Sequence, residues 1–188
     1  YTKNIEGGKK GYNFVWDFKA APGEIFFDKQ EEGRIREFKE KYSNHILVNP
    51  AIKNGLCRQN KDWGLKKWNK LSRALLSKGY SLVQSNHGNS GVSRELRVNE
   101  TTTNPILDGV ESIHTYGCRD MMMLILSVRS VVTTEGSIHH AAAALGKKAV
   151  VIFGGRVPPS ILGYDSHTNF FIDEVTMGGN LIKSPCGL

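Results

Sequence analysis

Short runs of apolar, mostly β-branched or aromatic residues recur along the chain from residue 45 onward, separated by polar segments. Because they are continuous rather than alternating, they favour strands buried on both faces, as in a parallel sheet. The sequence predicts strands at 45–50, 80–84, 113–115, 131–132, 149–153 and 170–172. Pro50 ends the first of them.

Apolar residues at helical spacing occupy most of the segments between these runs. Helices are predicted at 31–42, with Ile35 and Phe38 facing inward, and at 65–78, 118–129 and 138–145, the last ended by Gly146. Residues 85–105 are polar and are expected to form a loop with one helical turn at 93–98. Strands alternating with helices indicate an α/β fold, a Rossmann-like doubly wound parallel sheet whose strands all end at one edge.

The turn Glu135-Gly136-Ser137 joins a predicted strand to the Ala-rich helix. Gly136 allows a tight bend or the close approach of a ligand, and Ser137 is a candidate N-cap. Free N–H groups at a helix start attract phosphate, while a carboxylate at a strand end can accept hydrogen bonds from sugar hydroxyls. The alternative is an ordinary turn in which the neighbouring His139 and His140 have no binding role.

A second candidate site is the loop after the first strand, which carries Lys53, Arg58 and Lys61 before a long helix. Cations clustered at a helix N-terminus repel one another and the dipole unless an anion is near, so a phosphate site or a solvated basic loop is expected. Arg119 is a further phosphate candidate, and Asp120 beside it is expected to form a structural ion pair. Other strand-end candidates are Gly154, Arg156 and His167.

Composition narrows the function classes. The 188 residues carry a formal net charge of +7, which suits anionic partners or simply a solvated surface. The three cysteines are far apart without a CxxC pair, which favours a reducing compartment, here the cytoplasm. No spacing suggests a metal site, and no nucleic-acid-binding motif or membrane-length apolar run is visible.

The stretch EGSIHHAAAALGKKAVVIFGG at 135–155 resembles the nucleotide-binding signature of glycosyltransferase family nine, the heptosyltransferase-like proteins. Lys61-Asp62-Trp63-Gly64 followed by Trp68 is similar to the Lys-x-Trp-Pro…Trp element of the same family, with Gly64 in place of Pro. Thr134 stands where better-known members have Asp, two residues before the Gly, and Glu135 is the nearest acid. Trp63 and Trp68 are interpreted as packing residues.

The resemblance implies the C-terminal, donor-binding half of a GT-B fold, with residues 1–41 an extension or interdomain linker and 42–188 the nucleotide-sugar-binding domain. It assigns Lys61 to the donor diphosphate, Ser137 and the 136–139 backbone to phosphate, and Glu135 to ribose or sugar, while His139 orders the turn. Donor contacts are expected at Arg58, Lys61, Arg119, Glu135, Gly136, Ser137, His139 and Gly154.

The expected activity is transfer of a sugar from a nucleotide-sugar to a cell-surface glycan or lipopolysaccharide-type acceptor, without metal or cofactor. The resemblance places the catalytic base in an N-terminal GT-B domain too large for residues 1–41, in the same or another chain. The expected location is the cytoplasm, peripheral to the inner membrane face. Two alternatives remain: a non-catalytic nucleotide-binding module, and a binder of nucleic acid or anionic surfaces.

Overall fold

The computed structural model describes residues 2–6, 9–13, 19–53, 61–86, 102–154, 159–171, 174–177 and 180–183. Its centre is a six-stranded sheet in which every neighbouring pair is parallel. The strands are β3 (His45–Asn49), β5 (Ser81–Ser85), β7 (Glu111–Ile113), β8 (Ser130–Thr134), β9 (Ala149–Ile152) and β10 (Thr168–Phe170). The predicted doubly wound parallel sheet is therefore confirmed, although β7 and β10 each begin two residues before the predicted strand.

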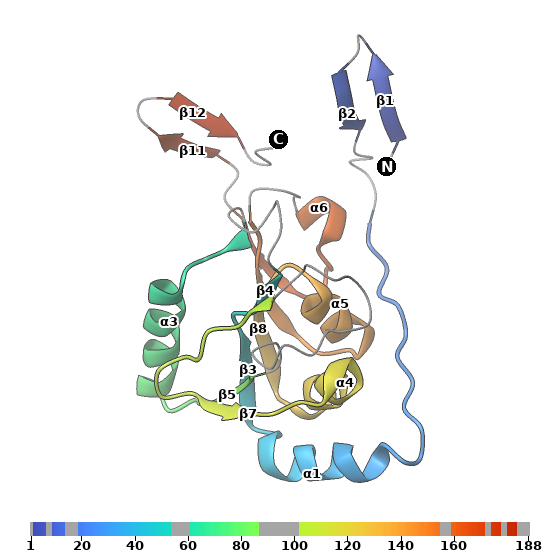
Figure 1. The fold of residues 1–188 in the computed structure, drawn as a ribbon, viewed down its shortest axis with the longest axis vertical. Helices are drawn as coiled ribbons and strands as arrows, with labels where there is room; N and C mark the ends of the chain where they lie inside the picture. The colour runs from blue at the N-terminus through green and yellow to red at the C-terminus, as the bar shows by residue number, and fades with distance from the viewer. Residues whose placement is uncertain are drawn as a thin grey trace.

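The strand order β10-β9-β8-β3-β5-β7 gives the sheet a reversal point. From β3 the chain moves outward through β5 to β7, then returns to the other side of β3 to form β8, β9 and β10 (Figure 1). In sheets of this order the connections leaving the two central strands diverge, and a crevice opens at their carboxyl ends. Here those strands are β3 and β8, so the segments that follow them are where a ligand site is expected.

Helices cover both faces of the sheet. Helix α3 lies on one face, and α4 and α5 lie on the other (Figure 1). The helices are α1 (Glu32–Tyr42), α3 (Leu65–Ser77), α4 (Gly117–Ser127), α5 (Ser137–Ala144) and α6 (Pro159–Leu162). The four predicted helices are confirmed in type and approximate bounds, whereas the short α6 was not predicted.

The alternation of side chains along β3 divides the core into two layers. Leu47 is fully buried against α1, α4 and α5, together with Val131 and Val151 of the neighbouring strands. Ile46 and Val48 point the other way, into the cluster that contains Trp68 of α3. Both faces of the central strands are thus apolar, which explains why the sequence shows continuous hydrophobic runs there.

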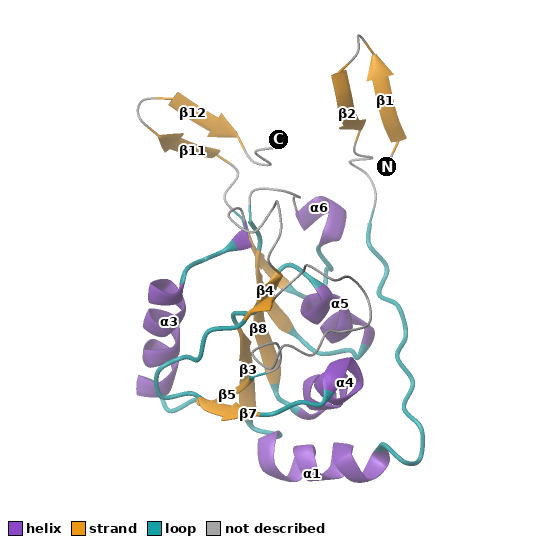
Figure 2. Cartoon of the chain, viewed as in Figure 1, coloured by secondary structure: helices purple, strands orange, loops and turns teal. Residues whose placement is uncertain are grey.

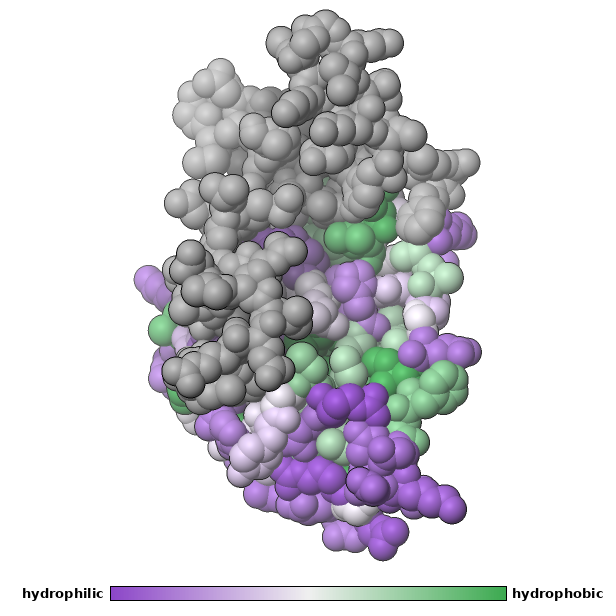
Figure 3. Space-filling view, turned by 45° about the vertical axis from the view of Figure 1, so that its right-hand side comes forward, coloured by the Kyte–Doolittle hydropathy of each residue, from purple (hydrophilic) through white to green (hydrophobic). Residues whose placement is uncertain are grey.

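Helix α1 packs against α4 and contributes to the first layer. Ile35 and Phe38 are buried as predicted, and so is Tyr42. The helix sequence alternates these residues with charged ones such as Arg36 and Lys39, which are exposed. Hydrophilic residues gather at the lower end of the face drawn in Figure 3, the end at which Figure 1 places α1.

Three two-stranded pieces lie outside the main sheet and were not predicted. They are the antiparallel pairs β1 (Thr2–Glu6) with β2 (Lys9–Asn13), β11 (Glu174–Met177) with β12 (Asn180–Lys183), and β4 (Ile52–Lys53) with β6 (Thr102–Thr103). These strands are short and mostly polar, so they leave little signal in the hydrophobic pattern. The helical turn expected at 93–98 lies outside the described residues. Within the described part of the chain, none of the helices combines the length and hydrophobicity that a membrane crossing requires.

Candidate functional site

An ion pair bridges the reversal point of the sheet. Lys61 lies in the connection between β4 and α3, on the β3 side, and Glu135 directly follows β8. The Lys61 Nζ is 3.3 Å from the Glu135 Oε1, and the side chains are 27% and 1% exposed, respectively. Two residues predicted to bind a ligand are therefore brought together, the lysine side chain partly exposed and the glutamate side chain buried.

The Glu135 carboxylate also joins the ends of two strands. Its Oε2 accepts a hydrogen bond of 2.7 Å from the Gly154 N–H, just after β9. The Glu135 N–H in turn donates to the Ile152 carbonyl at 3.2 Å. Gly154 is thus a third predicted residue at this site, and the turn after β8 is fixed to the segment after β9 by hydrogen bonds in both directions.

His139 orders the turn that begins α5, as predicted. Its Nδ1 accepts a hydrogen bond of 2.7 Å from the Gly136 N–H, and its Nε2, which then carries the proton, donates to the Leu162 carbonyl at 3.0 Å. The side chain is fully buried. Burial lowers the pKa of His139 to about 4, so the ring is neutral at physiological pH and both its nitrogens are occupied.

The prediction that Ser137 is the N-cap of α5 is wrong by one residue. Gly136 takes the N-cap position with φ 157° and ψ −163°. The Gly136 N–H donates its hydrogen bond to the His139 ring rather than to a capping hydroxyl. Ser137 is the first helical residue and is exposed. A Cβ at Gly136 would meet no atom within 4 Å, so there is open space beside the helix start. The first N–H groups of a helix have no partner within it and favour an anion.

His140 and Tyr164 form a contact that the sequence did not reveal. The His140 Nδ1 lies 2.8 Å from the Tyr164 hydroxyl, and the His139 and His140 rings are 3.9 Å apart at their centroids. Burial, followed by the charge of Lys61, lowers the pKa of His140. His167, a predicted strand-end candidate, is buried beside Tyr164, with ring centroids 5.4 Å apart. Tyr164 follows α6, and no spacing in the sequence connects it to α5.

Buried polar side chains form the base of the site at the carboxyl ends of the strands. The Asn49 Nδ2 donates to the Thr133 Oγ1 at 3.2 Å, across the junction of β3 and β8. The polar residues buried at these strand ends are Asn49, Ser85, Thr133, Thr134 and Glu135. Polar residues that close apolar runs, as in HILVN and VVTT, are the sequence signal that could have identified them.

Comparison with known families decides the relationship. A model of glycosyltransferase family 9 (heptosyltransferase) matches residues 13–176, a range that contains all of this site. The chain belongs to glycosyltransferase family 9. A comparison with curated proteins finds no match.

Solved structures of family 9 proteins share the fold. A family 9 glycosyltransferase from Veillonella parvula is similar with a TM-score of 0.54 and 12% identity, over 78% of this chain and 42% of that protein. The E. coli ADP-heptose lipopolysaccharide heptosyltransferase II gives a TM-score of 0.53 and 17% identity, over 83% of this chain and 46% of that one. The E. coli heptosyltransferase WaaC with ADP gives 0.50 and 13%, over 72% and 41%. This family 9 chain therefore spans less than half the length of these proteins.

The Lys61 segment of the family 9 chain is held by aromatic packing, as predicted for Trp63 and Trp68. Their rings meet edge to face with centroids 5.1 Å apart, and Trp68 is 1% exposed. The Gly64 N–H donates to the Asp62 Oδ1 at 2.8 Å, and Gly64 adopts a φ of 87°. A positive φ suits glycine and is unavailable to proline. Gly64 therefore allows a start of α3 that a proline at this position could not adopt.

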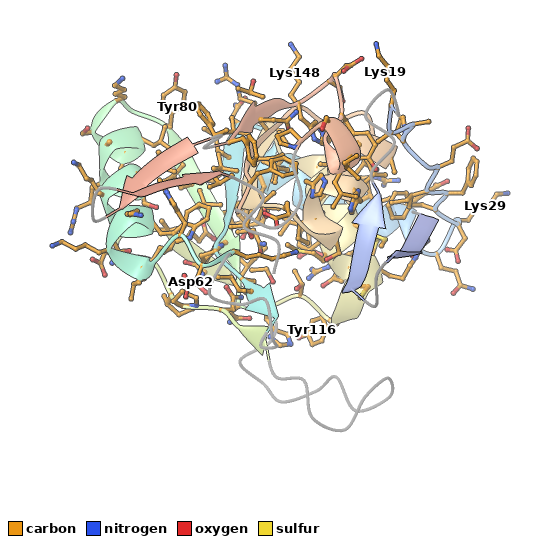
Figure 4. The ribbon with its side chains drawn as sticks, turned by 90° about the horizontal axis from the view of Figure 1, so that it is seen from above. Lys19, Lys29, Asp62, Tyr80, Tyr116 and Lys148 are labelled. Carbon is orange, nitrogen blue, oxygen red and sulfur yellow. The ribbon has the colours of Figure 1, made fainter. Side chains whose placement is uncertain are left out.

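The described contacts of Arg119 are with segment 19–31 and not with the Lys61–Glu135 pair. Its Nε donates to the Glu31 Oε1 at 2.8 Å, its guanidinium donates to the Phe26 carbonyl at 2.8 Å and it lies over the Phe27 ring. The extended segment 19–31 follows the molecule down to α1 (Figure 2), and in Figure 4 its residues Lys19 and Lys29 lie on the side opposite α3. Arg119 thus joins this segment to α4.

We expect Arg119→Gln to leave nucleotide affinity within about twofold of the unmodified chain, while segment 19–31 becomes more sensitive to limited proteolysis. The reason is that the described contacts of Arg119 fix this segment and do not include Lys61 or Glu135. Affinity can be measured by calorimetry and cleavage by mass spectrometry. A loss of affinity with unchanged cleavage would instead support the phosphate contact predicted from the sequence.

The neighbouring Asp120 confirms the predicted structural ion pair. It is buried, accepts from the Arg34 Nε at 3.0 Å and from the Tyr116 N–H at 2.9 Å, and so links α1 to the start of α4. Arg58 and Arg156, two further predicted contacts, lie outside the residues that the structure describes.

Proposed function

We propose that this chain binds the diphosphate of a nucleotide-sugar at the reversal point of its sheet. The observation that carries the proposal is the Lys61 ammonium, which lies 3.3 Å from the buried Glu135 carboxylate on a side chain that is 27% exposed. Beside it the N-terminus of α5 presents backbone N–H groups and the exposed Ser137. An ammonium close to a helix N-terminus is a suitable arrangement for a diphosphate.

Such a site supports glycosyl transfer by binding the leaving group. When the bond from sugar to diphosphate breaks, negative charge grows on the diphosphate, and fixed positive charge stabilises it without a metal. Lys61 and the start of α5 are the groups proposed for this role. Glycosyl transfer also needs a site that binds the acceptor and a catalytic base. We assign both to a second GT-B domain, because the chain covers less than half of the similar structures.

The relatives suggest which ligands to try first. One of the similar E. coli proteins is named for ADP-heptose and lipopolysaccharide, and the structure of the other, heptosyltransferase WaaC, contains ADP. We therefore propose an ADP-type nucleotide-sugar donor and a cell-surface glycan or glycolipid acceptor, with reaction at the cytoplasmic face of the inner membrane.

The experiment is calorimetric titration of the chain with ADP, GDP, UDP and CMP. We expect one diphosphate to bind and Lys61→Met to weaken it about tenfold or more, because a hydrogen bond to a charged group contributes about 1.5–3 kcal/mol. Lys70→Met is the matched control, since Lys70 is an exposed lysine on α3, the helix that follows Lys61. Absence of nucleotide binding, or equal losses in both variants, would contradict the proposal.

A further inference from the structure

We propose that Glu135 is a positioning residue, whose buried carboxylate holds the Lys61 ammonium ready for an anionic ligand without touching that ligand. This inference rests on the proposed function and goes beyond it. It differs from the role in ribose or sugar binding that the family resemblance implies for Glu135. It also gives a reason why a buried carboxylate lies beside a site proposed for an anion.

The surroundings of the carboxylate support this role. Only 1% of the Glu135 side chain is exposed, and Oε2 is already engaged by the Gly154 N–H at 2.7 Å. Oε1 is buried without a hydrogen-bond partner among the described residues. The Lys61 ammonium, 3.3 Å away, is therefore the described group that balances its charge. Because the carboxylate is buried in this way, a sugar hydroxyl could reach it only if the residues around it moved.

The Lys61 side chain is suited to serve two anions at once. An ammonium has three N–H donors, and the ion pair with Glu135 lies on only one side of it. The side chain is 27% exposed, so part of it still faces solvent. A lysine normally loses much rotamer freedom when it binds an anion. A lysine that is already held has lost that freedom during folding, and binding is then stronger.

The carboxylate also has an opposing effect, since its negative charge repels an anion at the same site. In the proposed arrangement Lys61 lies between the anion and the buried Glu135 carboxylate. We infer that holding the lysine outweighs the repulsion. Glu135→Gln is expected to weaken binding of inorganic pyrophosphate about threefold to tenfold, the range for one immobilised side chain.

Calorimetry with inorganic pyrophosphate tests whether Glu135 strengthens binding of an anion. Glutamine keeps the shape of glutamate, and its carbonyl can still accept from the Gly154 N–H, so Glu135→Gln is expected to fold. The matched control is Glu111→Gln, which removes the same charge from an ion pair with Lys41 at 2.7 Å on β7, the edge strand of the sheet. The control is expected to bind pyrophosphate like the unmodified chain. Unchanged or tighter binding by Glu135→Gln would overturn the inference.

A second measurement separates positioning from a general effect on structure. Relaxation of 13C-labelled lysine reports how ordered the Lys61 Cε is, even without ligand. We expect it to be ordered in the unmodified chain and in Glu111→Gln, and mobile in Glu135→Gln. If Lys61 stays ordered in Glu135→Gln while affinity falls, Glu135 acts on the ligand directly and the inference is wrong.

The choice of probe keeps this inference distinct from the proposed function. Pyrophosphate has no ribose or sugar, so a loss seen with a nucleoside diphosphate but not with pyrophosphate would mean that Glu135 contacts the sugar portion. That result would overturn the inference and leave the proposed function intact. Failure of the unmodified chain to bind either ligand would overturn both.

Discussion

Lys61→Met is expected to lower the free energy of unfolding by about 3 kcal/mol, and adding Glu135→Gln should restore most of the loss. Removing one partner of a buried ion pair leaves an uncompensated charge, which costs about 3–5 kcal/mol. The lower end of this range applies because Lys61 is partly exposed. In the double variant neither charge remains, so the penalty disappears although both native side chains have been replaced.

Urea denaturation at pH 7.5 measures this effect in the single and double variants. Lys41→Met is the matched control, because Lys41 pairs with Glu111 on the surface, where the side chains are 61% and 40% exposed. Exposed pairs contribute little. If Lys61→Met destabilises no more than Lys41→Met, or if Glu135→Gln adds a further loss, the carboxylate does not depend on Lys61.

Acidification from pH 7.5 to pH 4.5 is expected to lower the free energy of unfolding by about 2.5 kcal/mol through His139 alone. Burial lowers the pKa of His139 from 6.5 to about 4 in the folded chain. His139 is therefore protonated below pH 6.5 in the unfolded chain but stays neutral in the folded chain, so the free energy of unfolding decreases as the pH falls towards 4. Burial lowers the pKa of His140 and His167 too, which adds to the loss.

Urea denaturation at several pH values between 7.5 and 4.5 measures how steeply the free energy of unfolding depends on pH. His139→Gln supplies the comparison, because glutamine can accept from one group and donate to another without titrating. We expect this variant to be less stable at pH 7.5 but to lose less stability on acidification. An unchanged slope would assign the acid sensitivity to other groups.

The core and element order could be predicted because they depend on local patterns. Continuous runs such as HILVN and AVVIF identify strands covered on both faces, and Leu47 and Ile46 show this directly by entering opposite layers. The hairpin β1–β2 was missed because its residues TKNIE and KKGYN are mostly polar. In such pieces backbone hydrogen bonding, rather than hydrophobic pattern, defines the strand.

The candidate site could be predicted as a set of strand-end residues, but not as a set of contacts. From the sequence, Lys61 and Glu135 were expected in segments that meet at one edge of the sheet, each as a separate ligand contact. Their ion pair with each other was not predicted. The prediction that Ser137 is the N-cap was wrong because the His139 side chain accepts the hydrogen bond from the Gly136 N–H. That contact depends on the rotamer of His139, which the sequence does not reveal. The partner of Arg119 could not be found because Glu31 and Phe26 are distant in the sequence.

The pairing of Lys61 with an enclosed carboxylate has a consequence for how this protein can evolve. Loss of Lys61 alone leaves the buried carboxylate without its counterpart, and about 3 kcal/mol is a large share of the roughly 5–15 kcal/mol that keeps a domain folded. Lineages that lose the lysine should therefore first, or soon afterwards, have replaced the glutamate by a neutral residue. Across descendants of this chain, positions 61 and 135 should change together.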